Sequence, residues 1–122
     1  MQSLLTTVND CATRTGKLRG LDGRYLRVRS LHASLNVLIQ GGGAIVCKEW
    51  LVQIMKGIRK QNIDAVPVAN IHDEIQFEVQ TDQAEQLGQI TKQAMKSVEN
   101  ILNLNCPLDS DYKVGYTWAD TH

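Results

Sequence analysis

Residues 65–80 read AVPVANIHDEIQFEVQ, and this stretch decides what kind of fold the chain can form. Its second half, residues 75–80, alternates apolar and polar side chains, which is the period of a half-buried β-strand. Its first half is apolar enough for a second strand, and Pro67 restricts that strand to its start or to a sheet edge. We therefore predict a β-hairpin over residues 65–80.

The turn of this hairpin carries charge. His72, Asp73 and Glu74 stand between the two strands, where tight hairpins prefer Asn-Gly or Asp-Gly. Because other residues form such turns more readily, we expect these three side chains to serve a purpose other than turn formation.

The sequence before this hairpin predicts a short helix in residues 2–12 and a second hairpin that ends at residue 30. Asp22-Gly23 is the type I′ turn pair expected at the tip of that second hairpin. Its returning strand places Tyr25, Arg27 and Arg29 on one face. Two arginines beside an aromatic ring suit a phosphate backbone, although an ordinary solvated strand face explains them as well.

A long helix is predicted for residues 31–60, with Ser30 as its N-cap and basic residues at its C-terminal end. Apolar residues surround most of this helix, so we expect it to be largely buried. A further helix is predicted for residues 82–102, with Asp82 as N-cap and Glu85 completing a variant of the capping box. Residues 103–122 predict an irregular or weakly extended tail.

One face of the long helix is polar. His32, Asn36, Gln40 and Gly43 follow one another at spacings that stack them along one side of a helix. Three consecutive glycines there, residues 41–43, each cost roughly 1 kcal/mol relative to alanine. A helix tolerates this where something approaches its backbone closely. A hydrogen-bonded polar core with tight helix packing is an equally good explanation.

The bulk composition predicts a single domain, because 122 residues with 43% hydrophobic side chains can bury a modest core. The three cysteines, Cys11, Cys47 and Cys106, are widely spaced and odd in number, so a reducing, cytoplasmic compartment is expected rather than a disulfide framework. No secretory leader and no apolar run near ~18 residues is evident, so neither secretion nor a membrane span is expected.

The net charge of zero conceals an uneven distribution. Residues 1–60 carry ten Lys and Arg against three Asp and Glu, whereas residues 61–122 carry three against ten. The basic half could face a polyanion while the acidic half gathers carboxylates. Mutual neutralisation of two halves of a small domain explains the same split.

Three separated motifs together resemble one family. The His72-Asp73-Glu74 turn resembles the third polymerase motif of family A DNA polymerases, and HASLNVLIQGGGA (32–44) resembles their preceding long helix. The ending VGYTWADTH (114–122) resembles the Val-Gly…Trp-x-x-x-His terminus of that family. GLDGRYLRVRS (20–30) is similar to the segment ahead of the long helix in its phage replicative members. The resemblance covers residues ~16 to 122.

The resemblance implies an α+β fold, the C-terminal half of a polymerase palm with a small antiparallel sheet and two long helices. In that fold, residues 1–30 form a helix and hairpin, 31–60 the long helix, 65–80 the catalytic hairpin, 82–102 a helix and 103–122 the tail. The implied reaction is DNA-templated nucleotidyl transfer onto a DNA primer in a bacterial or phage-infected cell. The implied cofactor is Mg²⁺ in a two-metal site. The implied partners are primer–template DNA and deoxynucleoside triphosphates.

The resemblance also implies roles for individual residues. Asp73 would be one of two metal-bridging aspartates, Glu74 would support the metal shell or the primer end, and His72 would position the primer strand. A further set would contact DNA: His32, Asn36 and Gln40 along the minor groove, and Arg27 and Arg29 at phosphates.

The chain departs from the family on its N-terminal side. No Asp-x-Ser-x-x-Glu strand with the other catalytic aspartate precedes residue 16, and neither does a fingers helix that binds the nucleotide. We therefore expect that the chain is inactive alone and needs a second chain or a longer parent. The uncovered sheet edge and apolar face predict a sticky surface.

Other functions are possible. A catalytically inactive polymerase remnant or a small DNA-binding module would keep only the polar helix face. A metal-dependent His-Asp phosphohydrolase would need further histidines, and only His32 and His122 remain. A restriction-type nuclease would need Glu-x-Lys, whereas Ile75 and Gln76 follow Glu74.

Overall fold

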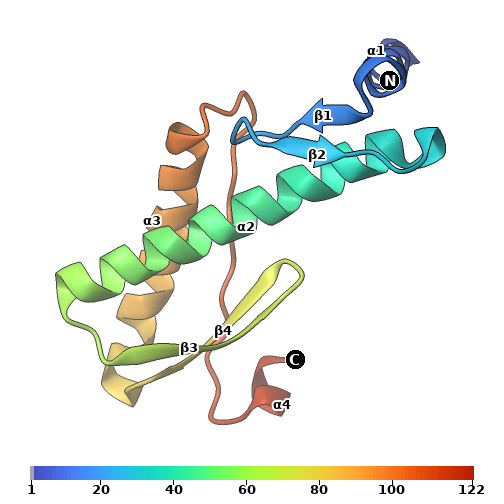
Figure 1. The fold of residues 1–122 in the computed structure, drawn as a ribbon. Coiled ribbons are helices and arrows are strands. Elements are labelled where there is room, and N and C mark those ends of the chain that lie inside the picture. Colours follow the sequence, from blue (N-terminus) through green and yellow to red (C-terminus); the bar gives the residue numbers. More distant parts are fainter. Residues whose placement is uncertain (1) are drawn as a thin grey trace. The chain divides into compact units, whose positions relative to one another are not determined.

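A computed structural model describes residues 2–122 as a mixture of helices and two-stranded antiparallel sheets (Figure 1). The chain divides into two compact units, the N-terminal unit Met1–Val46 and the C-terminal unit Cys47–His122. The helices are α1 (Gln2–Thr15), α2 (Ser34–Gln61), α3 (Ala84–Ile101) and α4 (Trp118–Thr121), and η1 (Leu31–Ala33) and η2 (Thr81–Gln83) are 3-10 turns. The strands are β1 (Lys17–Arg19), β2 (Tyr25–Arg27), β3 (Ala65–Ile71) and β4 (Glu74–Val79). None of the helices in this part of the chain is long and apolar enough to cross a membrane.

The core of the N-terminal unit lies between α1 and the first hairpin. Val8, Ala12 and Leu18 are buried together, and side chains from β2 and the start of α2 pack against them. α1 continues three residues beyond the predicted range to Thr15, and Gly16 follows it with a φ of +67°. The Gly16 amide donates to the Ala12 carbonyl at 2.8 Å, so this glycine closes the last turn of the helix.

The tip of the first hairpin differs from the predicted type I′ turn. Lys17 pairs with Arg27 and Arg19 with Tyr25, so five residues connect β1 to β2 instead of two. Gly23 has φ +85°, whereas Asp22 has no positive φ. The Gly23 amide donates to the Gly20 carbonyl at 3.0 Å. This is the arrangement of a longer hairpin loop with a glycine in the left-handed region.

The predicted cap of the long helix is also wrong. Ser30 makes no side-chain capping bond and precedes the 3-10 turn η1, so α2 begins at Ser34. The buried Ser34 hydroxyl instead donates to the Leu31 carbonyl at 2.8 Å and lies 2.5 Å from Asn9 Oδ1. The helix start is therefore fixed by a contact with α1, which no local signal indicates.

The expectation that the long helix is largely buried is wrong in this structure. Only Ser34, Trp50, Ile54 and Ile58 of α2 are buried, and large apolar side chains such as Ile39 are exposed. A helix that is apolar on most sides becomes buried only where other elements surround it.

The core of the C-terminal unit lies where α2 packs on α3. Apolar residues of both helices are buried there: Trp50, Ile54, Ile58, Leu87, Ile90, Ala94, Met95 and Val98. The Trp50 indole N–H donates to the Thr91 carbonyl at 2.9 Å, which satisfies the one polar atom of this buried ring. The predicted apolar face of residues 82–102 is thus core up to Val98, whereas Ile101 is exposed.

The start of α3 corrects the predicted capping box. Asp82 lies inside the turn η2, the N-cap position falls on Gln83, and no side-chain capping bond forms. The Gln83 side chain accepts the Asp64 amide at 2.8 Å instead, and Glu85 accepts the Tyr112 hydroxyl at 2.7 Å. These side chains connect the start of α3 to other segments of the same chain rather than to the first turn of α3.

The tail is irregular as expected until its end, where a short helix was not predicted. α4 begins after Thr117, whose hydroxyl accepts the Asp120 amide while the Asp120 carboxylate accepts the Thr117 amide. This reciprocal pair is a capping box, and it fixes the orientation of Trp118 and His122 at the end of the chain.

Candidate functional site

The candidate site is built on the hairpin of β3 and β4. The two strands pair from Ala65 opposite Val79 to Ile71 opposite Glu74, with a bulge between Pro67 and Ala69 (Figure 1). The hairpin predicted for residues 65–80 is therefore present. Its pairing ends directly at the acidic turn, which places that turn at the tip of a hydrogen-bonded ribbon.

The turn contains only two residues, His72 and Asp73. His72 has φ +55°, and Asp73 has no positive φ. This is the φ pattern of a type II′ turn, whose first central position is normally glycine. A non-glycine residue in the left-handed region costs roughly 1–3 kcal/mol, and such strain gathers at functional sites. The unusual turn residue thus supports a role for His72 beyond chain reversal.

Asp73 presents an exposed carboxylate at the tip of the hairpin. No hydrogen bond or ion pair within residues 2–122 occupies it. Its charge is nevertheless felt by Cys47 of α2, because burial and then the negative charge of Asp73 raise the pKa of the Cys47 thiol. Asp73 therefore lies near α2 and keeps its oxygens available.

Glu74 is held by two neighbours. Gln76 Nε2 donates to Glu74 Oε1 at 2.8 Å, and His122 Nε2 lies 2.9 Å from the same oxygen. The hydrogen bond from Gln76, followed by the interaction with His122, lowers the pKa of Glu74 below its usual value of 4.5. Glu74 is thus kept ionised and oriented beside Asp73.

Two residues of this site, Trp118 and His122, were not predicted as site residues. They lie one turn apart around α4, and their rings meet edge to face with centroids 5.3 Å apart. Trp118 Nε1 also lies 3.0 Å from His122 Nε2. That nitrogen accepts the indole N–H only when it carries no hydrogen and donates to Glu74 only when it carries one, so the tautomer of the ring decides which of the two contacts is a hydrogen bond. The i, i+4 spacing of Trp and His was the available sequence signal.

These side chains line one shallow hollow of about 210 Å³. Its lining residues are Ile71, His72, Asp73, Glu74, Gln76, Trp118 and His122. Within residues 2–122 no group of three or more His, Cys, Asp or Glu side chains could hold a metal ion. Mg²⁺ takes one or two carboxylates plus water and substrate phosphates. Asp73 fits one such position, whereas Glu74 already has one oxygen engaged and fits a supporting role.

The polar helix face lies in the N-terminal unit. His32, Asn36, Gln40 and Gly43 are all exposed, with His32 in η1 and the others on α2. The alternative of a hydrogen-bonded polar core is therefore wrong for these side chains. Tight packing does explain Gly41, because a Cβ there would lie 2.9 Å from Leu26 Cδ1, whereas a Cβ at Gly43 would meet nothing within 4 Å.

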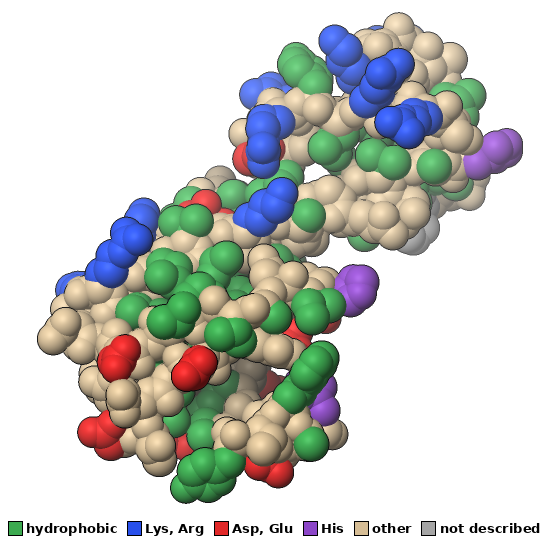
Figure 2. Space-filling view, turned by 60° about the horizontal axis from the view of Figure 1, so that its bottom comes forward, with side chains coloured by type: hydrophobic (Ala, Val, Ile, Leu, Met, Phe, Trp, Pro, Cys, Tyr) green, Lys and Arg blue, Asp and Glu red, His purple; other side chains and the backbone are tan. Residues whose placement is uncertain are grey.

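The charges follow the two units. The N-terminal unit has six Lys and Arg against two Asp and Glu, and the C-terminal unit has seven against eleven. Figure 2 shows Lys and Arg over the N-terminal unit and along one edge of the C-terminal unit, and most of the visible Asp and Glu over the C-terminal unit. Arg27 and Arg29 are both exposed on the basic unit. The carboxylate site and the basic hairpin thus belong to different units.

Comparison with known proteins gives a consistent result. The family model described as DNA polymerase family A matches residues 5–120. The chain is 38% identical over 112 residues to the DNA-directed DNA polymerase of Escherichia phage T7, which covers 86% of this chain and 16% of that protein. It is 29% identical over 105 residues to DNA polymerase I of Geobacillus stearothermophilus, with 84% and 12% covered.

A solved structure has a similar fold. The POL domain of Pol1 from M. smegmatis, in complex with DNA primer-template and dNTP, superimposes with a TM-score of 0.73 at 24% identity. The match covers 80% of this chain and 19% of that one. The chain therefore spans about a sixth of the phage polymerase and about a fifth of the solved polymerase domain. The predicted α+β polymerase fold is confirmed by this similarity.

Proposed function

This chain belongs to DNA polymerase family A, and from that premise we propose that it contributes part of the palm of a DNA-directed DNA polymerase. The proposed activity is templated nucleotidyl transfer onto a DNA primer in a bacterial or phage-infected cell. The proposed substrates are primer–template DNA and deoxynucleoside triphosphates. The observation that carries the proposal is the open Asp73 carboxylate on a strained hairpin turn.

The proposed role of Asp73 is to ligate Mg²⁺. Its carboxylate is exposed and lies in the hollow beside Glu74, so phosphate oxygens and water could complete the coordination. When bound, Mg²⁺ stabilises the charge that develops on a transferring phosphoryl group. Within the described residues Asp73 is the carboxylate of this hollow with both oxygens free. We propose that the second metal-bridging aspartate implied by the family resemblance lies outside these residues.

Glu74 and His72 are proposed to orient the primer end. Gln76 and His122 fix Glu74 as a carboxylate, which makes it a stable acceptor for a hydroxyl or a metal-bound water. His72 is exposed, and its unusual backbone angle in the turn sets the direction in which its side chain leaves the hairpin. These residues position groups next to Asp73, and Asp73 itself holds the reacting centre.

The exposed face of His32, Asn36 and Gln40 is proposed to follow the DNA minor groove. Minor-groove acceptors are broadly shared by all base pairs, so such a face senses the shape of a pair without selecting sequence. Arg27 and Arg29 are proposed phosphate contacts, which set position rather than specificity.

We propose that the remaining palm and the fingers are supplied by a second chain or by a longer parent protein, because the match covers only 16% of the length of the phage relatives. The exposed apolar side chains of β3 are the proposed contact for it. Val66 and Val68 are 58% and 59% exposed, and Ile71 is 44% exposed. An isolated two-stranded sheet is marginally stable, and covering an exposed apolar face of this kind stabilises it.

A noncatalytic DNA-binding fragment is the second candidate. It is favoured by the exposed polar helix face, which lies in the N-terminal unit and uses no residue of the Asp73 hollow. In that case the polar helix face would still bind duplex DNA, whereas Asp73 would have no metal to hold.

The test is primer extension with Mg²⁺ and all four nucleotides. The chain is assayed alone and with the protein encoded immediately upstream in its genome. We expect extension only in the mixture and its loss with Asp73→Ala. Asp111→Ala is the matched control, because this carboxylate is fully exposed and pairs only weakly with Lys92 at 4.0 Å. A folded Asp73→Ala complex that still extends primers would contradict the proposal, and duplex binding without extension would favour the noncatalytic fragment.

A further inference from the structure

The outer face of the first hairpin combines three cations with one aromatic ring. The register places Lys17 directly opposite Arg27 and Arg19 directly opposite Tyr25, so these four side chains share one face. All four are exposed, and Tyr25 keeps 71% of its surface accessible. Leu18, between the two cations of β1, points to the other face and is buried.

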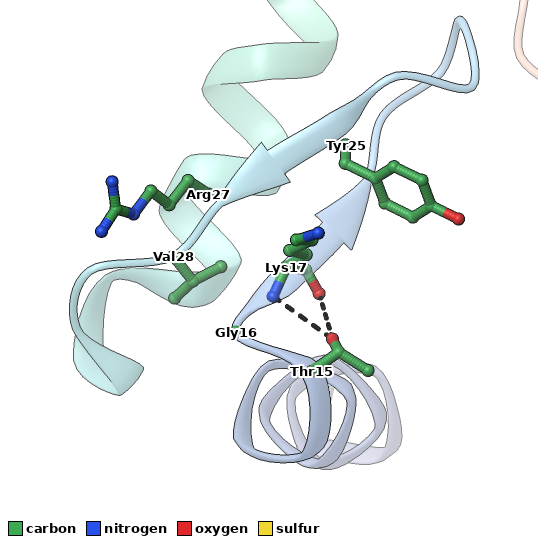
Figure 3. Close-up of a pocket in the computed structure, with 6 residues that line it drawn as sticks. All are labelled: Thr15, Gly16, Lys17, Tyr25, Arg27 and Val28. Atoms are coloured by element: carbon green, nitrogen blue, oxygen red, sulfur yellow. Dashed lines mark hydrogen bonds between the residues drawn. The ribbon is translucent and has the colours of Figure 1, made fainter.

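This face borders a hollow of about 440 Å³ in the N-terminal unit. Thr15, Gly16, Lys17, Tyr25, Arg27 and Val28 line it. Figure 3 shows the side chains of Arg27 and Tyr25 extending to either side of Lys17. The Lys17 ammonium lies 5.6 Å from the centre of the Tyr25 ring. The ring and the two cations are therefore spaced around one opening rather than scattered.

Among the described residues, no acidic side chain forms an ion pair with these cations. The ion pairs found within residues 2–122 involve none of Lys17, Arg19 and Arg27. Arg24, by contrast, is paired with Asp22 in the same hairpin. Like charges directly opposite each other across a strand pair are destabilising, so an anion bound between Lys17 and Arg27 would relieve their repulsion.

An exposed aromatic ring among unpaired cations fits a polyanion that also carries accessible flat rings able to stack on Tyr25. In a duplex the bases are stacked inside the helix, and only its phosphates could reach this face. A single strand offers both parts, because its unstacked bases can lie on an aromatic ring while cations follow its backbone. Family membership selects DNA as the polymer.

We propose that this hairpin face, formed by Lys17, Arg19, Tyr25 and Arg27, binds single-stranded DNA. One base stacks on Tyr25, and the adjacent phosphates lie against Lys17 and Arg27. The site lies in the N-terminal unit and uses no residue of the Asp73 hollow. It therefore extends the proposed function without depending on catalysis.

Fluorescence anisotropy with a labelled oligothymidine of about 12 nucleotides and a duplex of equal length tests the proposal. An OB-fold occupies about 4–16 nucleotides of a single strand, so about 12 nucleotides are long enough for this smaller hairpin face. We expect tighter binding of the single strand and about tenfold or greater loss with Tyr25→Ala. Tyr25→Phe keeps the ring and should bind like the unaltered chain.

Salt dependence separates the two kinds of contact. Each phosphate contact contributes about −0.7 to the slope of log K against log salt for single strands. Lys17→Gln with Arg27→Gln should make the slope shallower by about 1.4, whereas the matched control Arg24→Gln should leave it unchanged. Equal or tighter binding of the duplex, or equal losses with Tyr25→Phe and Tyr25→Ala, would overturn the proposal. Because all these side chains are exposed, unchanged circular dichroism is expected for every variant.

Discussion

Replacing Gly43 by alanine is expected to stabilise the fold while weakening the proposed contact with DNA. Gly43 lies in the interior of α2, it is exposed, and an added Cβ would meet nothing within 4 Å. The full difference in helix propensity between glycine and alanine is therefore available, about 1 kcal/mol. For a chain of 122 residues this corresponds to a rise in melting temperature of roughly 3–6 °C.

The neighbouring glycines provide internal controls with the same helical gain but different surroundings. A Cβ at Gly42 would lie 3.4 Å from Leu21, which is an ordinary contact, so Gly42→Ala should recover most of the gain. A Cβ at Gly41 would lie 2.9 Å from Leu26 Cδ1, and Leu26 must move against the core of its unit. Overpacking of this kind costs about 1–3 kcal/mol, so Gly41→Ala should be neutral or destabilising.

The assay is urea unfolding followed by far-UV circular dichroism, with the three variants measured in parallel. The predicted order of stability is Gly43→Ala, then Gly42→Ala, then Gly41→Ala. A destabilised Gly43→Ala variant would refute the reasoning, as would equal stabilisation by all three.

The second measurement on Gly43→Ala is binding to primer–template DNA. If the polar helix face follows the minor groove, a methyl group beside Gln40 narrows the approach, and affinity should fall although stability rises. A variant that is more stable and binds DNA equally well would separate this glycine from the proposed contact.

Three further changes test the C-terminal unit. NMR titration should find the pKa of Glu74 below 4.5, and Gln76→Ala should raise that pKa. Because the pKa of Glu74 is lower in the folded state, its contribution to stability is present above about pH 4.5. This contribution is lost as the pH falls through the pKa of the folded state. The Cys47 thiol should react slowly with alkylating reagents at pH 8, and Asp73→Asn should speed its labelling, measured by peptide mass spectrometry, because one of the two causes of its raised pKa is removed. Gly57→Ala should lower the free energy of unfolding by up to about 2 kcal/mol, since its Cβ would lie 2.7 Å from a buried isoleucine of α3 and the gain in helix propensity offsets only part of the overpacking.

The elements that the sequence predicts well are those whose signal is periodic. The alternation in residues 75–80 and the apolar spacing from Leu87 to Val98 report directly on which side chains face a core, so β4 and α3 were found. Helix starts were predicted less well. Ser30 and Asp82 are good capping residues, but Ser30 precedes a 3-10 turn and Asp82 lies inside one. Tertiary contacts of Ser34 and Gln83 set the helix starts instead.

The missed helix α4 did have a signal. Thr117 and Asp120 form the Thr-x-x-Asp pattern of a capping box, which is short enough to be overlooked in an irregular tail. That pattern also places Trp118 and His122 one turn apart on a helix. The partner of His122, Glu74, is 48 residues away in the chain, and no local pattern predicts that contact.

The candidate site shows why the acidic turn could be recognised but not assembled from sequence. Its charges stand out because a tight turn does not need them, and the positive φ of His72 agrees with that reasoning. What separates Asp73 from Glu74 is visible only in the structure: Gln76 and His122 occupy Glu74, whereas Asp73 keeps its oxygens free. Two adjacent carboxylates therefore have different roles available, and the one without partners is the one suited to bind a metal.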